Sequence, residues 1–71
     1  MNKRERIAEI VDSMLDYFSV DSFDELDSLM QMDLITEIED CLDINLPLSL
    51  LDHEFTRKQF IDAVLGIYEE M

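Results

Sequence analysis

The chain has 71 residues, of which 18 are acidic and 5 are lysine or arginine, and its net charge of -13 excludes several classes of function. A surface of this sign repels nucleic-acid phosphates and anionic lipids, so we expect no direct binding to nucleic acid or to membranes. Hydrophobic residues make up 48% of the chain, which is too many for a disordered acidic tail. We therefore expect a single folded domain over residues 1–71, and a basic partner is the simplest use for its charge.

The sequence also predicts where this domain works. No apolar run approaches the roughly 20 residues that a membrane-spanning helix needs. The N-terminal residues lead into an amphipathic segment rather than into the apolar stretch of a signal peptide. A single cysteine, Cys41, cannot form an internal disulfide or a multi-cysteine metal site. We therefore expect a cytoplasmic monomer without a membrane span and without a bound metal.

The first predicted element is a helix over residues 3–18. Its apolar residues recur at the spacing of one buried helix face; they are Ile7, Ile10, Val11, Met14, Leu15 and Phe18. Residues 19–27 show no clean period, which predicts a loop held to the core by Val20, Phe23 and Leu26. We interpret the helical methionines Met14, Met30 and Met32 as core filler rather than as cofactor ligands.

A second helix is predicted to begin at Ser28. Its core stripe consists of Leu34, Ile35, Ile38 and Leu42. Cys41 falls on or beside this stripe, where a free cysteine usually serves as inert packing. The helix ends in the segment 43–47, because the residue before Pro47 is pushed out of the helical region. Ser28 and Gln31 have the spacing of a capping box, as do Ser22 and Glu25 in the preceding loop.

The last third of the chain predicts a short helical turn and a third long helix. Residues 48–51 form an apolar bridge of about one turn, and Thr56 with Gln59 opens the last helix as another capping box. The inner face of this helix consists of Phe60, Ile61, Val64, Leu65 and Tyr68. Gly66 inside it costs about 1 kcal/mol relative to alanine. The predicted fold is all-α: a small antiparallel bundle of three long helices and one short helix.

The charges are unevenly distributed along the chain. Residues 7–56 contain fourteen acidic residues and no lysine or arginine. A face of one sign steers a partner of the opposite sign and speeds the encounter. Arg57 and Lys58 stand at the start of the last helix, where the helix dipole disfavours cations, and a contact with a nearby carboxylate would offset that cost.

The sequence offers little for catalysis. His53 is the only histidine, and it lies in a connector between Asp52 and Glu54, which favours a solvated surface position. Carboxylates are abundant but do not converge on a site, and those around 21–27 lack the spacing of a calcium loop. We therefore expect a protein that is not an enzyme, with no catalytic residues.

The segment from Asp27 onward resembles the acyl carrier protein family. The family signature is Asp-Ser-Leu at the start of its second helix, and this chain has Asp27-Ser28-Leu29. Further matches follow without a gap at Asp33-Leu34, Ile38-Glu39, Leu42, Ile44-Asn45-Leu46-Pro47, Thr56 and Ile61. Leu26-Asp27-Ser28 is similar to the variant found in D-alanyl carriers and some peptidyl carriers.

The resemblance implies a tethering function. Ser28 would receive 4′-phosphopantetheine from coenzyme A through a phosphopantetheinyl transferase, with Asp27 and Leu29 flanking the attachment site. The arm would hold acyl or aminoacyl groups as thioesters and deliver them to loading ligases or synthases with basic docking faces. The pathways it implies are fatty acid, polyketide or nonribosomal-type biosynthesis.

The same helix offers residues for docking these enzymes. Leu29 and Met32 fall beside the serine, and Asp33, Glu37 and Asp40 continue the helix with negative charge. The alternative is an acidic helical adaptor or inhibitor that binds a basic protein surface. In that reading Ser28 is only a helix cap.

Overall fold

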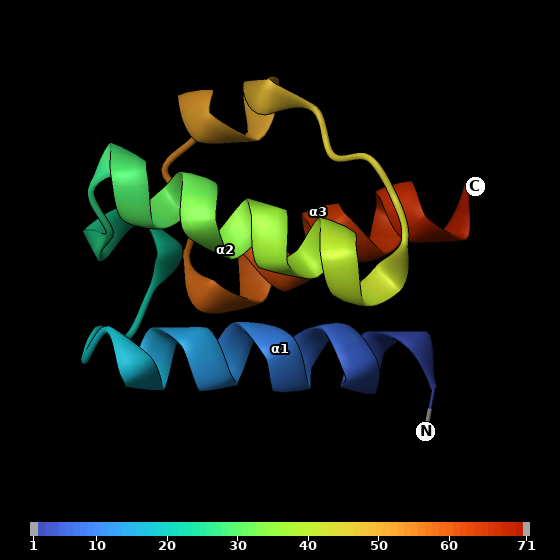
Figure 1. Cartoon of the computed structure of the whole chain (residues 1–71), viewed down its shortest axis with the longest axis horizontal. Helices are drawn as coiled ribbons and strands as arrows, with labels where there is room; N and C mark the ends of the chain where they lie inside the picture. Colours follow the sequence, from blue (N-terminus) through green and yellow to red (C-terminus); the bar gives the residue numbers. More distant parts are fainter. Residues whose placement is uncertain (1, 71) are drawn as a thin grey trace.

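The computed structural model describes residues 2–70, which form three α-helices and two short 3₁₀ turns (Figure 1). The long helices are α1 (Lys3–Tyr17), α2 (Ser28–Leu42) and α3 (Arg57–Glu69). The 3₁₀ turns are η1 (Phe23–Glu25), between α1 and α2, and η2 (Leu48–Asp52), between α2 and α3. Helix α1 runs opposite to α2 and α3, and no strand occurs in residues 2–70. The predicted all-α bundle is confirmed, and η1 is an additional turn within the predicted loop.

Helix α1 begins and ends at residues that satisfy its free backbone groups. The Asn2 side chain accepts a hydrogen bond of 2.8 Å from the Glu5 amide. At the other end, Ser19 adopts a left-handed conformation with φ of 61°, and the Val20 amide donates to the Leu15 carbonyl at 3.0 Å. This reversal ends the helix one residue before the predicted boundary and turns the chain toward α2.

Helix α2 ends through a left-handed residue and a carboxylate. Asp43 has φ of 55°, and the next amide, that of Ile44, donates to the Glu39 carbonyl at 3.2 Å. The Glu39 side chain then accepts a hydrogen bond of 2.7 Å from the Leu46 amide. Together with Pro47 these contacts end the helix at Leu42, at the start of the segment 43–47 where the sequence predicts its end.

The core is a single cluster of apolar side chains from every element. Its buried members are Ile7, Val11, Leu15, Phe23, Leu26, Leu34, Ile35, Ile38, Leu42, Ile44, Leu46, Leu50, Phe60, Ile61 and Val64. The predicted stripe of α2 is confirmed completely. The stripes of α1 and α3 are wider than the buried set, because Ile10, Met14, Phe18, Leu65 and Tyr68 are only half-buried.

The methionines also differ from one another in burial. Met14 and Met30 pack against the core from its edge, as the core-filler interpretation expects. Met32 is 41% exposed and does not fill the core. Its place on the helix explains this, since it stands away from the stripe that ends at Leu42.

Helix α3 begins with the predicted capping box. The Gln59 amide donates to Thr56 Oγ1 at 3.2 Å, and the Thr56 amide donates to Gln59 Oε1 at 3.0 Å. The helix continues through Gly66 to Glu69, so the glycine does not interrupt it. No helix in residues 2–70 has the length and apolar character needed to cross a lipid bilayer.

Arg57 makes the carboxylate contact that its place at a helix N-terminus requires. Its Nη1 lies 3.0 Å from Asp12 Oδ1 on α1, and its Nε donates to the Asp21 carbonyl at 3.0 Å. One side chain therefore joins α1, the loop before α2 and the start of α3. Arg4 adds a second link between α1 and α3 through an ion pair with Asp62.

We predict that Arg57→Ala lowers the free energy of unfolding by about 0.5–1.5 kcal/mol, because it removes one part-exposed ion pair and one hydrogen bond to a carbonyl. Lys58→Ala is the matched control, since Lys58 is the next residue on the same helix and is exposed. It should change the unfolding free energy by less than about 0.5 kcal/mol. Urea unfolding followed by circular dichroism measures both, and equal effects would contradict the role of Arg57.

Candidate functional site

Ser28 is the first residue of α2 and its side chain is exposed. The predicted start of the helix is confirmed. The preceding loop and the N-terminus of α2 lie together at one end of the bundle (Figure 1). Leu29, the next residue, is 77% exposed although it is large and apolar. The chain thus presents a hydroxyl and an unburied leucine side by side at a helix N-terminus.

The cap of α2 is Asp27 rather than Ser28. Asp27 Oδ1 accepts a hydrogen bond of 2.9 Å from the Met30 amide, and the Asp27 carbonyl accepts one from the Gln31 amide at 2.9 Å. Asp27 has the extended backbone that a cap needs, whereas Ser28 is already helical. The Ser28–Gln31 capping box was therefore wrong by one residue, and no hydrogen bond within residues 2–70 engages the Ser28 hydroxyl.

The expected capping box in the loop was also wrong. The Ser22 hydroxyl donates to the Asp24 carboxylate instead of capping η1. Glu25 Oε2 accepts a hydrogen bond of 2.7 Å from the Asp21 amide rather than from Ser22. Residues 23–25 form a 3₁₀ turn rather than the first turn of an α-helix, and the Ser22 hydroxyl bonds to Asp24 there, so no reciprocal Ser22–Glu25 capping box forms.

The loop before Ser28 is fastened to α2 and α3. Phe23 is fully buried and stacks on Phe60, with ring centroids 4.1 Å apart and planes 7° apart. The Asp24 amide donates to the Phe55 carbonyl at 3.1 Å. Gln31 Nε2 donates to the Phe23 carbonyl at 3.2 Å, so the side chain assigned to the capping box holds the loop instead. Sequence reasoning missed these three contacts. Their partner residues are not connected by any local periodic pattern, which is the signal that sequence reasoning uses.

The expected docking residues occupy different sides of α2. Leu29, Asp33 and Asp40 are exposed and share the outward face of the helix. Met32 lies on the flank next to Ser28, one turn along the helix. Glu37 lies on the opposite flank, where it lines a groove with α1. Leu29, Met32 and Asp33 therefore lie within the first two turns beside Ser28, whereas Asp40 lies near the C-terminal end of α2 and Glu37 lies on the opposite flank.

Cys41 is exposed, so its interpretation as buried packing was wrong. It stands on the α1 side of α2, just outside the stripe, where Arg6 donates to its carbonyl at 3.3 Å. Partial desolvation and the nearby Glu37 carboxylate raise the pKa of the Cys41 thiol, because both disfavour the thiolate. The thiol is therefore a weak nucleophile at neutral pH.

The other residues considered for catalysis or metal binding form no metal-binding group in the part of the chain that the structure describes. His53 is exposed, as its position between two acids predicts, and its ring lies 5.2 Å from that of Phe55. Residues 2–70 hold no group of three or more metal-ligating side chains.

An exposed hydroxyl at a helix N-terminus fits a phosphodiester. The amides of Ser28 and Leu29 stand in the first turn, where helical backbone N–H groups have no intrahelical partner. The positive end of the helix dipole lies at the same place. The Asp27 carboxylate already accepts the hydrogen bond of the Met30 amide. The cap therefore does not depend on the neighbouring Ser28 hydroxyl or on a group attached to it.

Comparison with known protein families shows to which family this chain belongs. A family model described as a phosphopantetheine attachment site matches residues 5–63. The chain belongs to this family. It is a non-catalytic carrier, and its cofactor is covalently bound 4′-phosphopantetheine. No curated protein and no solved structure matches the chain.

Membership of this family also indicates the general kinds of enzyme with which the carrier interacts. A carrier of this family interacts with a phosphopantetheinyl transferase and with biosynthetic enzymes. The resemblance of the sequence to acyl carrier proteins is thereby confirmed.

We predict that Asp27→Ala destabilises the apo-carrier by about 0.5–2 kcal/mol, because it removes the N-cap of α2. Ser28→Ala is the matched control at the adjacent position. It should change the unfolding free energy by less than about 0.5 kcal/mol, since its hydroxyl caps nothing. Urea unfolding of the two unmodified variants measures the difference, and a larger loss for Ser28→Ala would restore serine as the cap.

Proposed function

We propose that Ser28 is the residue to which 4′-phosphopantetheine is attached, and that residues 1–71 act as one carrier domain of a cytoplasmic biosynthetic pathway. The observation that supports this most directly is the division of labour at the start of α2. Asp27 caps the helix, and the exposed Ser28 hydroxyl beside it has no hydrogen-bonding role. Ser28 also stands within the matched segment 5–63.

The alternative of an adaptor or inhibitor has less support than a carrier, although the acidic surface fits both. That reading explained Ser28 as a helix cap, and Asp27 supplies the cap instead. The family match favours a carrier as well, because an adaptor has no need of a phosphopantetheine attachment site.

When bound, the arm supplies a thiol that holds acyl or aminoacyl groups as thioesters. The chain itself provides a defined point of attachment. Ser28 stands on a capped helix whose preceding loop is fastened to α3 through Phe23 and to the connector before α3 through Asp24. A tether that starts from a fixed point raises the effective concentration of its cargo at a docked enzyme.

We propose that partner enzymes dock over the outward face of α2. Leu29 and Met32 give apolar contact beside Ser28, while Asp33, Glu37 and Asp40 attract basic partners. Helix α2 contains no lysine or arginine that would neutralise these acids. Complementary charge speeds the encounter and leaves release easy, as a carrier that hands on its cargo requires.

The cargo belongs to fatty acid, polyketide or nonribosomal-type biosynthesis in this proposal. Leu26-Asp27-Ser28 is similar to D-alanyl and peptidyl carriers, which favours an aminoacyl group. An adenylating enzyme encoded beside this carrier would support aminoacyl cargo, and a ketosynthase would support acyl cargo.

We predict that a broad-specificity phosphopantetheinyl transferase with coenzyme A adds one phosphopantetheine group to the wild-type chain and none to Ser28→Ala. Intact-mass spectrometry measures the addition. Ser22→Ala is the matched control, because Ser22 lies in the adjacent loop with its hydroxyl bound to Asp24. It should be modified fully, and modification of Ser28→Ala would refute the assignment.

We further predict that Asp33→Asn/Asp40→Asn lowers kcat/KM of the transferase about threefold to thirtyfold while kcat changes little, because lost charge slows encounter rather than chemistry. The control is Glu69→Gln/Glu70→Gln, which removes the same charge from the far end of α3. Added salt should lower kcat/KM of the wild type by screening. If salt left it unchanged, steering by α2 would be the wrong account.

A further inference from the structure

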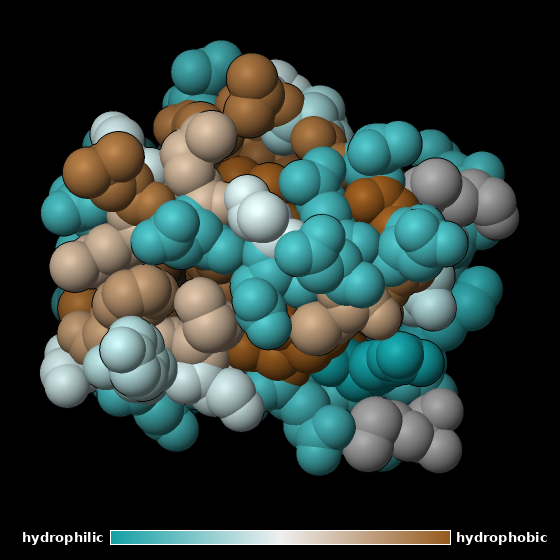
Figure 2. Space-filling model, in the orientation of Figure 1, coloured by the Kyte–Doolittle hydropathy of each residue, from teal (hydrophilic) through white to brown (hydrophobic). Residues whose placement is uncertain are grey.

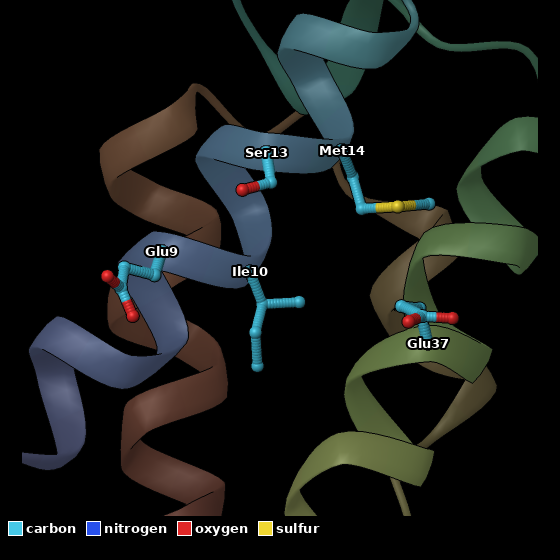
Figure 3. Close-up of a pocket in the computed structure, with 5 residues that line it drawn as sticks. All are labelled: Glu9, Ile10, Ser13, Met14 and Glu37. Carbon is cyan, nitrogen blue, oxygen red and sulfur yellow. The ribbon is translucent and has the colours of Figure 1, made fainter.

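A groove of about 420 Å³ lies between α1 and α2, away from the face that surrounds Ser28. It is lined by Glu9, Ile10, Ser13, Met14 and Glu37. Figure 3 shows Ile10 and Met14 directed from α1 toward α2, with Glu37 coming from α2 and Glu9 on the outer side of α1. Figure 2 shows apolar surface between these two helices, bordered by hydrophilic residues of α2.

The chemistry of this groove combines an apolar floor with two carboxylates. Ile10 and Met14 are half-buried and form the floor, whereas Glu9 and Glu37 are exposed. Neither glutamate forms an ion pair with any residue in 2–70. The nearest basic residue along α1, Arg6, donates to the Cys41 carbonyl at the end of α2. The two carboxylates therefore face solvent without a cation.

An exposed aromatic residue extends the same side of α1. Tyr17 is 80% exposed and follows Ser13 and Met14 by one helical turn. Its ring meets only the edge of the Phe18 ring, at 5.3 Å between centroids. An unburied tyrosine next to an apolar groove is typical of a protein-binding surface, where tyrosine often supplies much of the binding energy.

We propose that the α1–α2 groove is a second docking surface, which binds a helix of a partner protein through an arginine or lysine side chain. The aliphatic stem of that side chain lies on Ile10 and Met14, and its cationic head lies beside Glu37, while Glu9 adds negative charge from the outer side of α1. The charge of the groove selects a basic occupant. Its open form selects a side chain presented by a protein over an enclosed small molecule, because Glu9, Ser13 and Glu37 are all exposed.

The dimensions of the surface favour a helical partner. Glu9 and Tyr17 are separated by about two helical turns, or roughly 12 Å along α1. A helix with a basic and an apolar residue two turns apart matches the acidic groove and Tyr17 at that spacing. Such a partner shares Glu37 with the proposed enzyme-docking residues but leaves Leu29, Asp33 and Asp40 free, so the carrier can hold it while a second protein engages Ser28.

The test uses the full chain and a crosslinked helical peptide that carries one arginine and one leucine two turns apart. The control peptide replaces arginine with citrulline, its uncharged isostere. Amide NMR shifts of the isotopically labelled carrier should change at Ile10, Ser13, Met14, Tyr17 and Glu37 with the arginine peptide. The citrulline peptide should bind about fivefold to tenfold more weakly.

Two charge-matched variants separate the groove from general acidity. Glu9→Gln/Glu37→Gln should weaken binding of the arginine peptide about fivefold to tenfold, whereas Asp33→Asn/Asp40→Asn should leave it within about twofold. All four positions are exposed, so the amide spectra should otherwise keep the pattern of the folded wild type.

Three results would overturn the proposal. They are equal binding of both peptides, shifts centred on Leu29 and Asp40 instead of the groove, and a concentration-dependent dimer in sedimentation whose interface is the groove. Binding of spermidine with the same shifts but without binding of the peptide would assign the groove to small cations instead. None of these outcomes bears on priming at Ser28, which the mass measurement tests separately.

Discussion

The position of the α2 N-terminus depends on one buried aromatic stack. The Phe23 side chain points from the loop into the core and packs face to face on Phe60 of α3. Both side chains are fully buried. The loop backbone is then tied to Phe55, and Gln31 of α2 binds the Phe23 carbonyl. Because these contacts join the loop to two helices at once, the start of α2 cannot move without opening the core. The proposed attachment point is therefore held by contacts to the core although it lies at the end of an irregular segment.

The scarcity of positive charge is the second constraint. Arg4 and Arg57 link α1 to α3 and the loop, Arg6 binds a carbonyl at the end of α2, and Lys3 lies over the Tyr68 ring at 5.3 Å. Four of the five basic residues of the chain thus hold elements together. Within residues 2–70, Asp33 and Asp40 on the outward side of α2 form no ion pair. Their repulsion costs stability, and that uncompensated charge is what a basic enzyme surface can use.

The helices could be predicted because their signals are local. Pro47 and the repeat of Leu34, Ile38 and Leu42 define α2 without reference to the rest of the chain. The cap could not be resolved, because Asp27 and Ser28 are adjacent residues with similar capping preference and only the backbone conformation chooses between them. The prediction that Cys41 is buried was wrong for a related reason. Cys41 stands at the edge of the apolar stripe of α2, where a small rotation of the helix decides whether a side chain is buried or exposed. The need for a carboxylate near Arg57 was predictable, but its identity as Asp12 required the folded chain.

The displacement of the cap by one residue has an energetic consequence for a carrier. If Ser28 were the cap, its oxygen would accept a backbone N–H, and esterifying it would weaken that bond, worth about 0.5–2 kcal/mol. A domain of this size has a stability of only a few kcal/mol, so this loss would be a large fraction of it. With Asp27 as the cap, the hydroxyl can be modified and the helix still keeps its first hydrogen bond. If Ser28 carries the arm, as we propose, Asp before Ser lets α2 keep the same N-terminal structure before and after priming, and partner enzymes would meet one docking surface in both states.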